Sequence, residues 1–143
     1  MTNPFMEEAI KEAQKAAEMG EVPVGAVLVK NEKILCRAHN VTEREQDILA
    51  HAEMLVMKEA LQKLGTKRLT GCSLYVTLEP CPMCTGAILL ARPDRVYFGA
   101  YDPEAGACGG KNDLLRGTSI DVYGGMMEAP CAELLKTFFQ SLR

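Results

Sequence analysis

The sequence has few histidines, no excess of positive charge and no long apolar run. It contains only two histidines, and its 16 Lys and Arg residues are outnumbered by 19 Asp and Glu residues, which gives a net charge of −3. A broad basic surface for nucleic acid is therefore not indicated, and any contact with RNA or DNA would be a local patch. No run of 18 apolar residues is present, and the N-terminus lacks a signal-peptide pattern. We expect a cytoplasmic protein with no membrane partner.

The composition is that of an ordinary globular protein. The 143 residues are 48% apolar and 24% charged, which is enough for one domain spanning 1–143 with a single core. Six cysteines are present. In a reducing compartment these are expected to be thiols or metal ligands and not disulfides.

Hydrophobic periodicity and turn residues predict alternating helices and strands. Asn3 and Pro4 form an N-cap and a first helical position, and Gly20 is expected to end that helix. Further helices are predicted at 49–64, 82–91 and 129–142, and strands at 22–29, 34–40, 72–78, 95–100 and 119–123. A hairpin followed by strand–helix–strand implies a mixed sheet with helices on both faces. The predicted fold class is α/β, a three-layer αβα sandwich with a five-stranded mixed sheet.

Some local features follow from the same patterns. The polar segment 41–47 is predicted to be a loop, and the glycine-rich segment 101–118 a loop with one helical turn at 113–116. The helix at 49–64 would place His51 in its first turn. The last helix carries an apolar stripe that is expected to face the core: Cys131, Leu134, Leu135, Phe138 and Leu142.

The segment Pro80-Cys81-Pro82-Met83-Cys84 follows a predicted strand and opens a helix. Cysteines three residues apart at a helix N-terminus can direct both sulfurs to one point, and the exposed N–H groups there favour thiolate over thiol. Such thiolates bind zinc well, but they supply only two ligands. His51, in Ala50-His51-Ala52-Glu53, offers a third. The combined pattern is typical of zinc deaminases.

Three protein ligands would make this a catalytic metal site. His51, Cys81 and Cys84 leave the fourth position of a tetrahedral zinc for water, whose pKa falls from about 15.7 toward neutrality. Glu53 is placed to take the proton and to deliver protons to the ring nitrogen and the leaving amine of an aminopurine or aminopyrimidine. We therefore predict one Zn²⁺ per subunit and Glu53 as the catalytic acid and base.

A Cys-x-x-Cys pair alone has two other interpretations, a redox dithiol and half of a structural zinc site. A structural site needs a fourth ligand, and the remaining cysteines are Cys36, Cys72, Cys108 and Cys131. None has a nearby metal-ligand partner in the sequence, so we interpret each as an ordinary thiol. A catalytic zinc is favoured, and a non-catalytic zinc-stabilised binding module is the alternative from a different class.

Segments along nearly the whole chain resemble the bacterial tRNA-specific adenosine deaminases. They are 20–27 (GEVPVGAV), 50–53 (AHAE), 74–84 (LYVTLEPCPMC), 86–88 (GAI), 96–100 (VYFGA), 131–135 (CAELL) and 138–139 (FF). The resemblance implies a cytidine deaminase-like fold and conversion of the wobble adenosine of a tRNA anticodon stem-loop to inosine. It also implies a homodimer with the site near the subunit interface.

The same resemblance implies substrate contacts. Asn40, eleven residues before His51, would hydrogen-bond the flipped nucleoside, and Asp102 would contact the sugar and backbone beside it. The base pocket would be walled by Val22, Pro23 and Leu78. Phe138 and Phe139 fall where the last helix adds aromatic contacts to loop nucleotides, although both also fit the core stripe. Whichever is exposed would suit stacking on a splayed base.

Where this sequence departs from the family pattern, the departures bear on the substrate and not on the reaction. Where the family usually has Asn-His-Arg before its last strand, this chain has Arg116-Gly117-Thr118-Ser119. The alternative within enzymes is therefore deamination of a free base or nucleoside, such as guanine, cytosine or cytidine.

Overall fold

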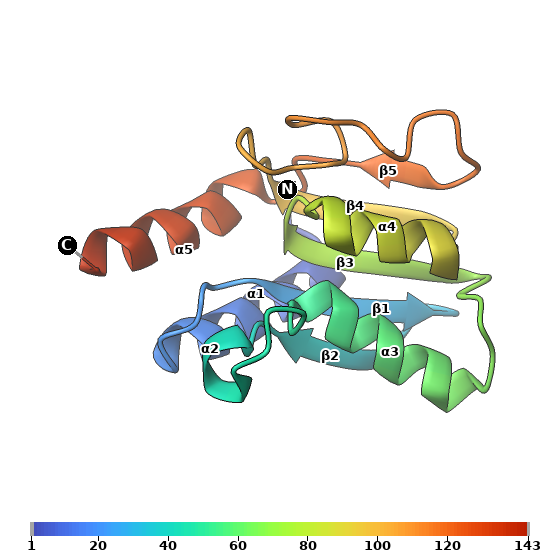
Figure 1. Cartoon of the computed structure of the whole chain (residues 1–143), viewed down its shortest axis with the longest axis horizontal. Helices are drawn as coiled ribbons and strands as arrows, with labels where there is room; N and C mark the ends of the chain where they lie inside the picture. The colour runs from blue at the N-terminus through green and yellow to red at the C-terminus, as the bar shows by residue number, and fades with distance from the viewer. Residues whose placement is uncertain (1, 143) are drawn as a thin grey trace.

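One mixed sheet of five strands forms the centre of the molecule, and helices lie on both of its faces (Figure 1). The computed structural model describes residues 2–142. The strands are Gly25–Lys30 (β1), Lys33–His39 (β2), Cys72–Leu78 (β3), Arg95–Ala100 (β4) and Asp121–Tyr123 (β5). The helices are Pro4–Glu18 (α1), Thr42–Glu45 (α2), Ala52–Leu64 (α3), Pro82–Ala91 (α4) and Glu128–Ser141 (α5).

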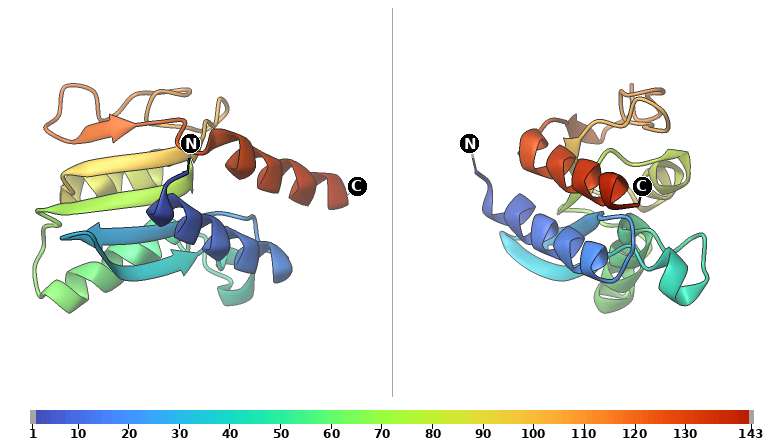
Figure 2. Two further views of the ribbon diagram at one scale, coloured as in Figure 1. Left: turned by 180° about the vertical axis from the view of Figure 1, so that it is seen from behind. Right: turned by 90° about the vertical axis from the view of Figure 1, so that its left-hand side faces the viewer.

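The strand order is β2-β1-β3-β4-β5. β1 pairs antiparallel with β2 and β3, whereas β3, β4 and β5 run parallel to one another. Helices α3 and α4 lie on one face, and α1 and the start of α5 lie on the other (Figure 2). The predicted α/β class, with helices on both faces of a five-stranded mixed sheet, is confirmed.

Two apolar clusters hold the layers together. The larger lies between the sheet and α3 with α4, and its fully buried side chains include Leu28, Leu74, Ile88 and Phe98. The smaller lies between the sheet and α1, and it includes Met6, Val27 and Tyr75. Full burial of a side chain of this size contributes about 1.5–3 kcal/mol.

The ends of several elements follow from local signals. The Asn3 Oδ1 atom accepts hydrogen bonds from the N–H groups of Phe5 and Met6, each at 3.0 Å, and Gly20 has a φ of +77°. The predicted start and stop of α1 are therefore confirmed, and β3, α4 and β4 have their predicted limits. β1 begins at Gly25 and not at residue 22, because the Val24 N–H turns back to the Val22 carbonyl at 2.8 Å.

The segment before the metal-ligand candidate His51 differs from the prediction. Residues 42–45 form the short helix α2 and not a loop, because the buried Glu21 carboxylate accepts from the N–H groups of Glu43 (3.1 Å) and Arg44 (2.7 Å). Helix α3 begins at Ala52, whose N–H donates to Asn40 Oδ1 at 2.8 Å. His51 is therefore the N-cap residue of α3 and does not lie in its first turn.

The last helix differs as well. Of its expected core stripe only Cys131 is buried, and Leu142 is 67% exposed. The reason is geometric: α5 extends past the edge of the sheet where β3 and β4 end (Figures 1 and 2), so its C-terminal half has no sheet beneath it. The helical turn expected at 113–116 is a hydrogen-bonded turn without a helix. No helix within residues 2–142 is long and apolar enough to cross a bilayer.

Candidate metal centre and active site

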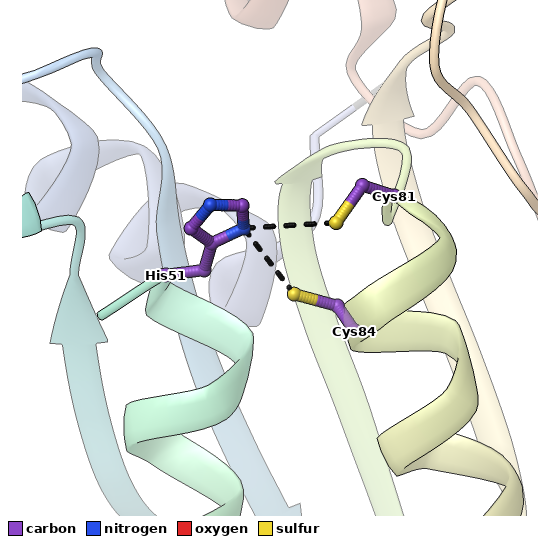
Figure 3. Close-up of side chains that lie close together, drawn as sticks. All are labelled: His51, Cys81 and Cys84. Atoms are coloured by element: carbon purple, nitrogen blue, oxygen red, sulfur yellow. Dashed lines mark hydrogen bonds between the residues drawn. The ribbon is translucent and has the colours of Figure 1, made fainter. Parts of the chain in front are cut away.

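Three metal-ligand side chains meet where α3 and α4 begin (Figure 3). The Nδ1 atom of His51 lies 3.7 Å from the Sγ of Cys81 and 3.4 Å from the Sγ of Cys84. All three candidate ligand atoms lie within 4.8 Å of one another. The structure thus brings together residues that are 30 positions apart in the sequence.

The donor set and its spacing fit zinc. Bond lengths of about 2.3 Å to sulfur and 2.0–2.1 Å to nitrogen in a tetrahedral site require ligand atoms roughly 3.5–3.8 Å apart. The two nitrogen–sulfur distances of 3.4 and 3.7 Å agree with this. Within residues 2–142 the cluster holds no fourth His, Cys, Asp or Glu ligand. Three ligands are the number expected of a zinc site that reacts with substrate.

Local backbone conformation explains why these side chains are free to converge. Cys81 is the N-cap of α4 and Pro82 occupies its first turn, so the chain enters the helix sharply. His51 is the N-cap of α3, but its side chain does not cap the helix. Asn40 supplies the acceptor for the Ala52 N–H instead. As a result the imidazole of His51 faces the sulfurs.

The protonation of the two thiols is linked. The hydrogen bond from Cys84, supported by one from His51, lowers the pKa of Cys81 to about 3. The same bond to Cys81, together with burial, raises the pKa of Cys84. The hydrogen bond to Cys81 also raises the pKa of His51. Without a metal the three groups therefore share protons that a cation would displace.

Glu53 lies beside the cluster in the first turn of α3. Its side chain is almost fully buried, and burial raises its pKa to about 7. Its Oε1 atom has no hydrogen-bond partner among the described residues. A buried acceptor without a partner is costly unless a ligand uses it. Residues two apart on a regular helix diverge by about 200°. His51 and Glu53 avoid this divergence because His51 is the N-cap residue and lies outside the helix.

The residues expected to contact the substrate differ in their burial and in the hydrogen bonds that they already make. Asn40 is 8% exposed and its Oδ1 is already used by Ala52. Asp102 follows the C-terminal end of β4, next to the end of β3, and its Oδ1 accepts from Glu104 and Ala105. The expected pocket walls are half-buried or buried: Val22, Pro23 and Leu78.

The two phenylalanines of α5 differ in exposure. Phe139 is 50% exposed, whereas Phe138 is half-buried and packs edge-on against it with ring centroids 5.3 Å apart. Of the pair, Phe139 therefore offers more free surface for stacking.

The remaining four cysteines stay outside the cluster. All are buried: Cys36, Cys72, Cys108 and Cys131. Two of them show their local roles, since Cys36 donates to the Val56 carbonyl at 3.3 Å and Cys131 packs where a Cβ on Gly99 would overlap it. They behave as core thiols.

Two buried carboxylates near the site were not singled out from the sequence. Glu21 holds α2, as described above, and Glu79 accepts three backbone N–H groups from the loop after β4. Glu79 stands in the quoted motif directly before Pro80, so its position was a usable signal. Glu21 stands in the quoted segment 20–27 in the same way. The partners of both side chains lie more than 20 residues away, so the sequence alone could not show what either carboxylate holds.

An α/β sheet that carries a His-Cys-Cys metal-ligand cluster, with a buried glutamate beside it, defines a hydrolytic metalloenzyme of the zinc type. Residues 2–100 match the family model of the cytidine and deoxycytidylate deaminase zinc-binding region. The match spans more than half of the chain. This protein belongs to that deaminase family.

Relatives and solved structures narrow the similarity. The chain is 54% identical to the tRNA-specific adenosine deaminase of Bacillus subtilis, over 97% of this chain and 89% of that one. A structure from a study of A-to-I editing by tRNA:A34 deaminases at the wobble position of transfer RNA superposes with a TM-score of 0.86 at 47% identity, covering 92% and 98%. The guanine deaminase of Bacillus subtilis superposes less well, with a TM-score of 0.67 at 37% identity over 76% and 69%.

Proposed function

We propose that this chain deaminates the wobble adenosine of a tRNA anticodon loop to inosine, as a single domain spanning 1–143. One observation carries the chemistry: the three-ligand cluster of His51, Cys81 and Cys84 lies beside the unpartnered carboxyl oxygen of Glu53. The substrate rests on the similarity to tRNA-specific adenosine deaminases along nearly the whole chain. The guanine deaminase of Bacillus subtilis has a lower TM-score and a lower coverage than the tRNA:A34 deaminase structure, so the similarity supports a free base as substrate less than it supports tRNA.

His51, Cys81 and Cys84 would hold one zinc ion per subunit. When bound, zinc supplies Lewis acidity that makes water a competent nucleophile near neutral pH. The protein's own task is to move protons. The overall reaction consumes one water per adenosine and releases ammonia. Because that water supplies the protons, one carboxyl group that takes them up and passes them on is enough for the proton transfers.

Glu53 is the group that we assign to proton transfer. It takes a proton from the attacking water and delivers protons to the N1 atom of the adenine ring and to the amino group that leaves C6. Its burial excludes bulk water, which would otherwise compete for these protons. Its unpartnered Oε1 needs a donor, and the water or the substrate supplies one.

Asn40 and its neighbours are assigned to substrate binding. Because Asn40 Oδ1 accepts from Ala52, its Nδ2 group is the part that donates to an acceptor of the flipped nucleoside. Asp102 would contact the sugar and backbone beside it, and Phe139, the more exposed of the phenylalanine pair with Phe138, would stack on a loop base. The walls of the base pocket are Val22, Pro23 and Leu78.

A homodimer is part of the proposal, with the outer face of α3 and α4 as its interface. Three apolar residues of α4 and of the segment just before α3 are exposed: Ile48 is 83% exposed, Leu49 51% and Leu90 78%. Between the helices lies a groove of 370 Å³ that includes Leu49, Met54, Leu55 and Ala87 in its lining. A helix as uniformly apolar as α4 is normally covered on all sides. A second copy brings the same apolar face, and it would lie close to His51 at the start of α3.

We place the dimer in the cytoplasm, where tRNA is available.

A substrate comparison tests this proposal. Purified, zinc-loaded protein is incubated with an anticodon stem-loop that carries adenosine at the wobble position, and separately with adenosine, guanine, cytosine and cytidine. The matched RNA control carries guanosine at the wobble position. We expect inosine only in the first RNA. Turnover of a free base or nucleoside with no inosine in RNA would establish the alternative, and no turnover of any substrate would favour a binding module.

A further inference from the structure

We infer that Glu79 is a positioning residue for Asp102: its buried carboxylate anchors the loop 101–110 beside the metal centre and so fixes how Asp102 meets the RNA. The part that concerns RNA rests on the proposed function. No role for Glu79 follows from the metal cluster itself, because it is not among the ligands.

Three hydrogen bonds tie the loop to this one side chain. Glu79 Oε1 accepts from the Asp102 N–H at 2.9 Å. Glu79 Oε2 accepts from the N–H groups of Cys108 at 2.9 Å and Gly110 at 2.6 Å. The donors come from both ends of the loop, so a single carboxylate closes it.

Glu79 is buried and depends on these three hydrogen bonds to stabilise its carboxylate. The side chain is 2% exposed, and no Lys, Arg or His within residues 2–142 forms an ion pair with it. Its carboxylate is thus stabilised by backbone N–H groups alone. Bonds from N–H groups to a carboxylate are about twice as strong as neutral ones, and a lost partner leaves a buried polar group unsatisfied.

The loop is built closely around this carboxylate. A Cβ atom added at Gly106 or at Gly110 would overlap the Glu79 carboxyl group, and at Gly110 it would also lie 2.6 Å from the Asp102 carbonyl oxygen. Glycine is therefore required at both positions by close approach. This close approach accounts for part of the glycine content of this loop.

The same segment connects the loop to the metal ligands. Pro80, between Glu79 and Cys81, accepts at its carbonyl from the Ala107 N–H at 2.9 Å and from the Thr85 hydroxyl at 3.4 Å. Thr85 follows the ligand Cys84 in α4 and lies 3.6 Å from the Cys108 sulfur. The loop thus rests on the turn that carries both cysteine ligands.

Asp102 is held by its backbone and by one carboxyl oxygen. Its N–H is bound to Glu79, and its Oδ1 accepts from the N–H groups of Glu104 and Ala105, each at 3.1 Å. Within residues 2–142 its Oδ2 atom has no hydrogen-bond partner, which leaves that oxygen available to a ligand. Glu79 therefore sets the direction of Asp102 without touching the substrate.

The substitution Glu79→Gln separates this role from general stability. A glutamine has one acceptor oxygen, and two N–H groups, from Cys108 and Gly110, compete for it against one from Asp102. The amide NH₂ then faces the Asp102 N–H, and the two donors repel each other. The hydrogen bond to Asp102 is therefore lost before those to Cys108 and Gly110. Glu104→Gln, on an exposed side chain of the same loop, is the matched control with the same change of charge.

We expect Glu79→Gln to keep its zinc, to change kcat less than 3-fold and to raise KM for the anticodon stem-loop about 10-fold. Amide hydrogen exchange in the peptide that contains Asp102 should become at least 10-fold faster, whereas Glu104→Gln should match the wild type in all four measurements. In an Asp102→Asn background, which keeps an oxygen for Glu104 and Ala105, adding Glu79→Gln should raise KM less than 2-fold, because the two changes act on one contact.

Gly110→Ala is a second variant: its Cβ would overlap the Glu79 carboxyl group and so displace the bond between Glu79 and the Asp102 N–H from the loop side. It should raise KM about as much as Glu79→Gln. If Glu79→Gln does not fold, Gly110→Ala tests the inference in its place. Unchanged KM and exchange in either folded variant, or effects that multiply fully with Asp102→Asn, would overturn the inference. A wild type that makes no inosine in RNA overturns the proposed function and the RNA part of this inference together. An active wild type with insensitive variants overturns the inference alone.

Discussion

His51 and Cys81 occupy the same position in two neighbouring helices. Each is an N-cap residue with extended backbone, at φ −75° and ψ 149° for His51 and φ −76° and ψ 173° for Cys81, and neither side chain caps its own helix. Their ligand atoms lie 3.7 Å apart in the space between the helix ends. The positive ends of two helix dipoles therefore meet at the cluster, which favours thiolates there.

The ligand assignment predicts which cysteines matter for zinc. Cys84→Ser should reduce bound zinc to well below one per chain, because two remaining ligands hold the ion weakly. Cys108→Ala removes another buried thiol that lies outside the cluster, and it should keep one zinc per chain. Metal analysis of the purified variants measures both. Equal zinc in Cys84→Ser and the wild type would contradict the assignment.

Glu53→Gln should abolish most of the turnover without loss of metal. The amide cannot accept and return protons, and the loss of general acid–base catalysis is expected to cost roughly 10²–10⁴-fold in kcat. Zinc content should stay at the wild-type level. Glu59→Gln, on the exposed side of the same helix, is the matched control and should retain full activity. Near-normal kcat in Glu53→Gln would rule out the proton-transfer role.

Asn40 has two assigned tasks that substitution can separate. Asn40→Asp keeps an oxygen for the Ala52 N–H but lacks the NH₂ donor, so stability should stay close to that of the wild type while kcat/KM falls at least 10-fold. Asn40→Ala should lose activity and, in addition, about 0.5–2 kcal/mol of stability, the usual cost of a lost helix cap. Denaturant unfolding and initial-rate kinetics distinguish the two. A fully active Asn40→Asp variant would refute the substrate contact.

Glu12 couples stability to pH on the α1 face. Burial alone would raise its pKa, but hydrogen bonds from Lys15 and His39 outweigh burial and lower the pKa below its usual value of 4.5. The carboxylate therefore stabilises the fold above about pH 4.5, and this contribution is lost as the pH falls through the lower folded-state pKa. At pH 7, Glu12→Gln should cost about 1–2 kcal/mol of unfolding free energy.

The cost of Glu12→Gln should be smaller at an acidic pH well below 4.5 than at pH 7, because the wild-type carboxyl loses its charge as the pH falls through its lowered folded-state pKa. Urea unfolding at the two pH values measures the difference. Glu18→Gln alters the same charge at an exposed position of α1, and it should change stability by less than about 0.5 kcal/mol. A cost of Glu12→Gln that does not depend on pH would exclude the ion pair as its source.

The proposed dimer makes a prediction for the α3/α4 face. The pair of substitutions Ile48→Lys and Leu90→Lys places two charges on that face, and it should shift light-scattering mass from dimer to monomer. Leu142→Lys adds a charge at a residue that directly follows α5 and is 67% exposed, and it should leave the dimer intact. If the wild type is monomeric, or if the paired variant stays dimeric, this interface is wrong.

Most of the central structure was predictable from local signals. The limits of β3, α4 and β4 follow from β-branched residues, Pro82 at the helix start and the glycine and proline residues around them. The pairing of Cys81 with Cys84 needed only their spacing at a helix N-terminus. These features depend on neighbours in the sequence, which a single chain displays directly.

The features that escaped prediction depend on distant partners. Helix α2 exists because Glu21 lies beneath it, and α3 begins one residue after His51 because Asn40 supplies the cap. The role of Glu79 required knowing that residues 102–110 fold back over it. The exposure of α5 could not be read from its apolar stripe, because periodicity predicts a contact face but not whether the sheet extends beneath it.

Zinc X-ray absorption on the wild-type protein tests the central claim, an active metal held by only three protein ligands. The fine structure should show two sulfur atoms at about 2.3 Å and two light atoms near 2.0–2.1 Å, from His51 and one water. A third sulfur in the shell would mean that another cysteine closes the site, and the catalytic interpretation would then be wrong.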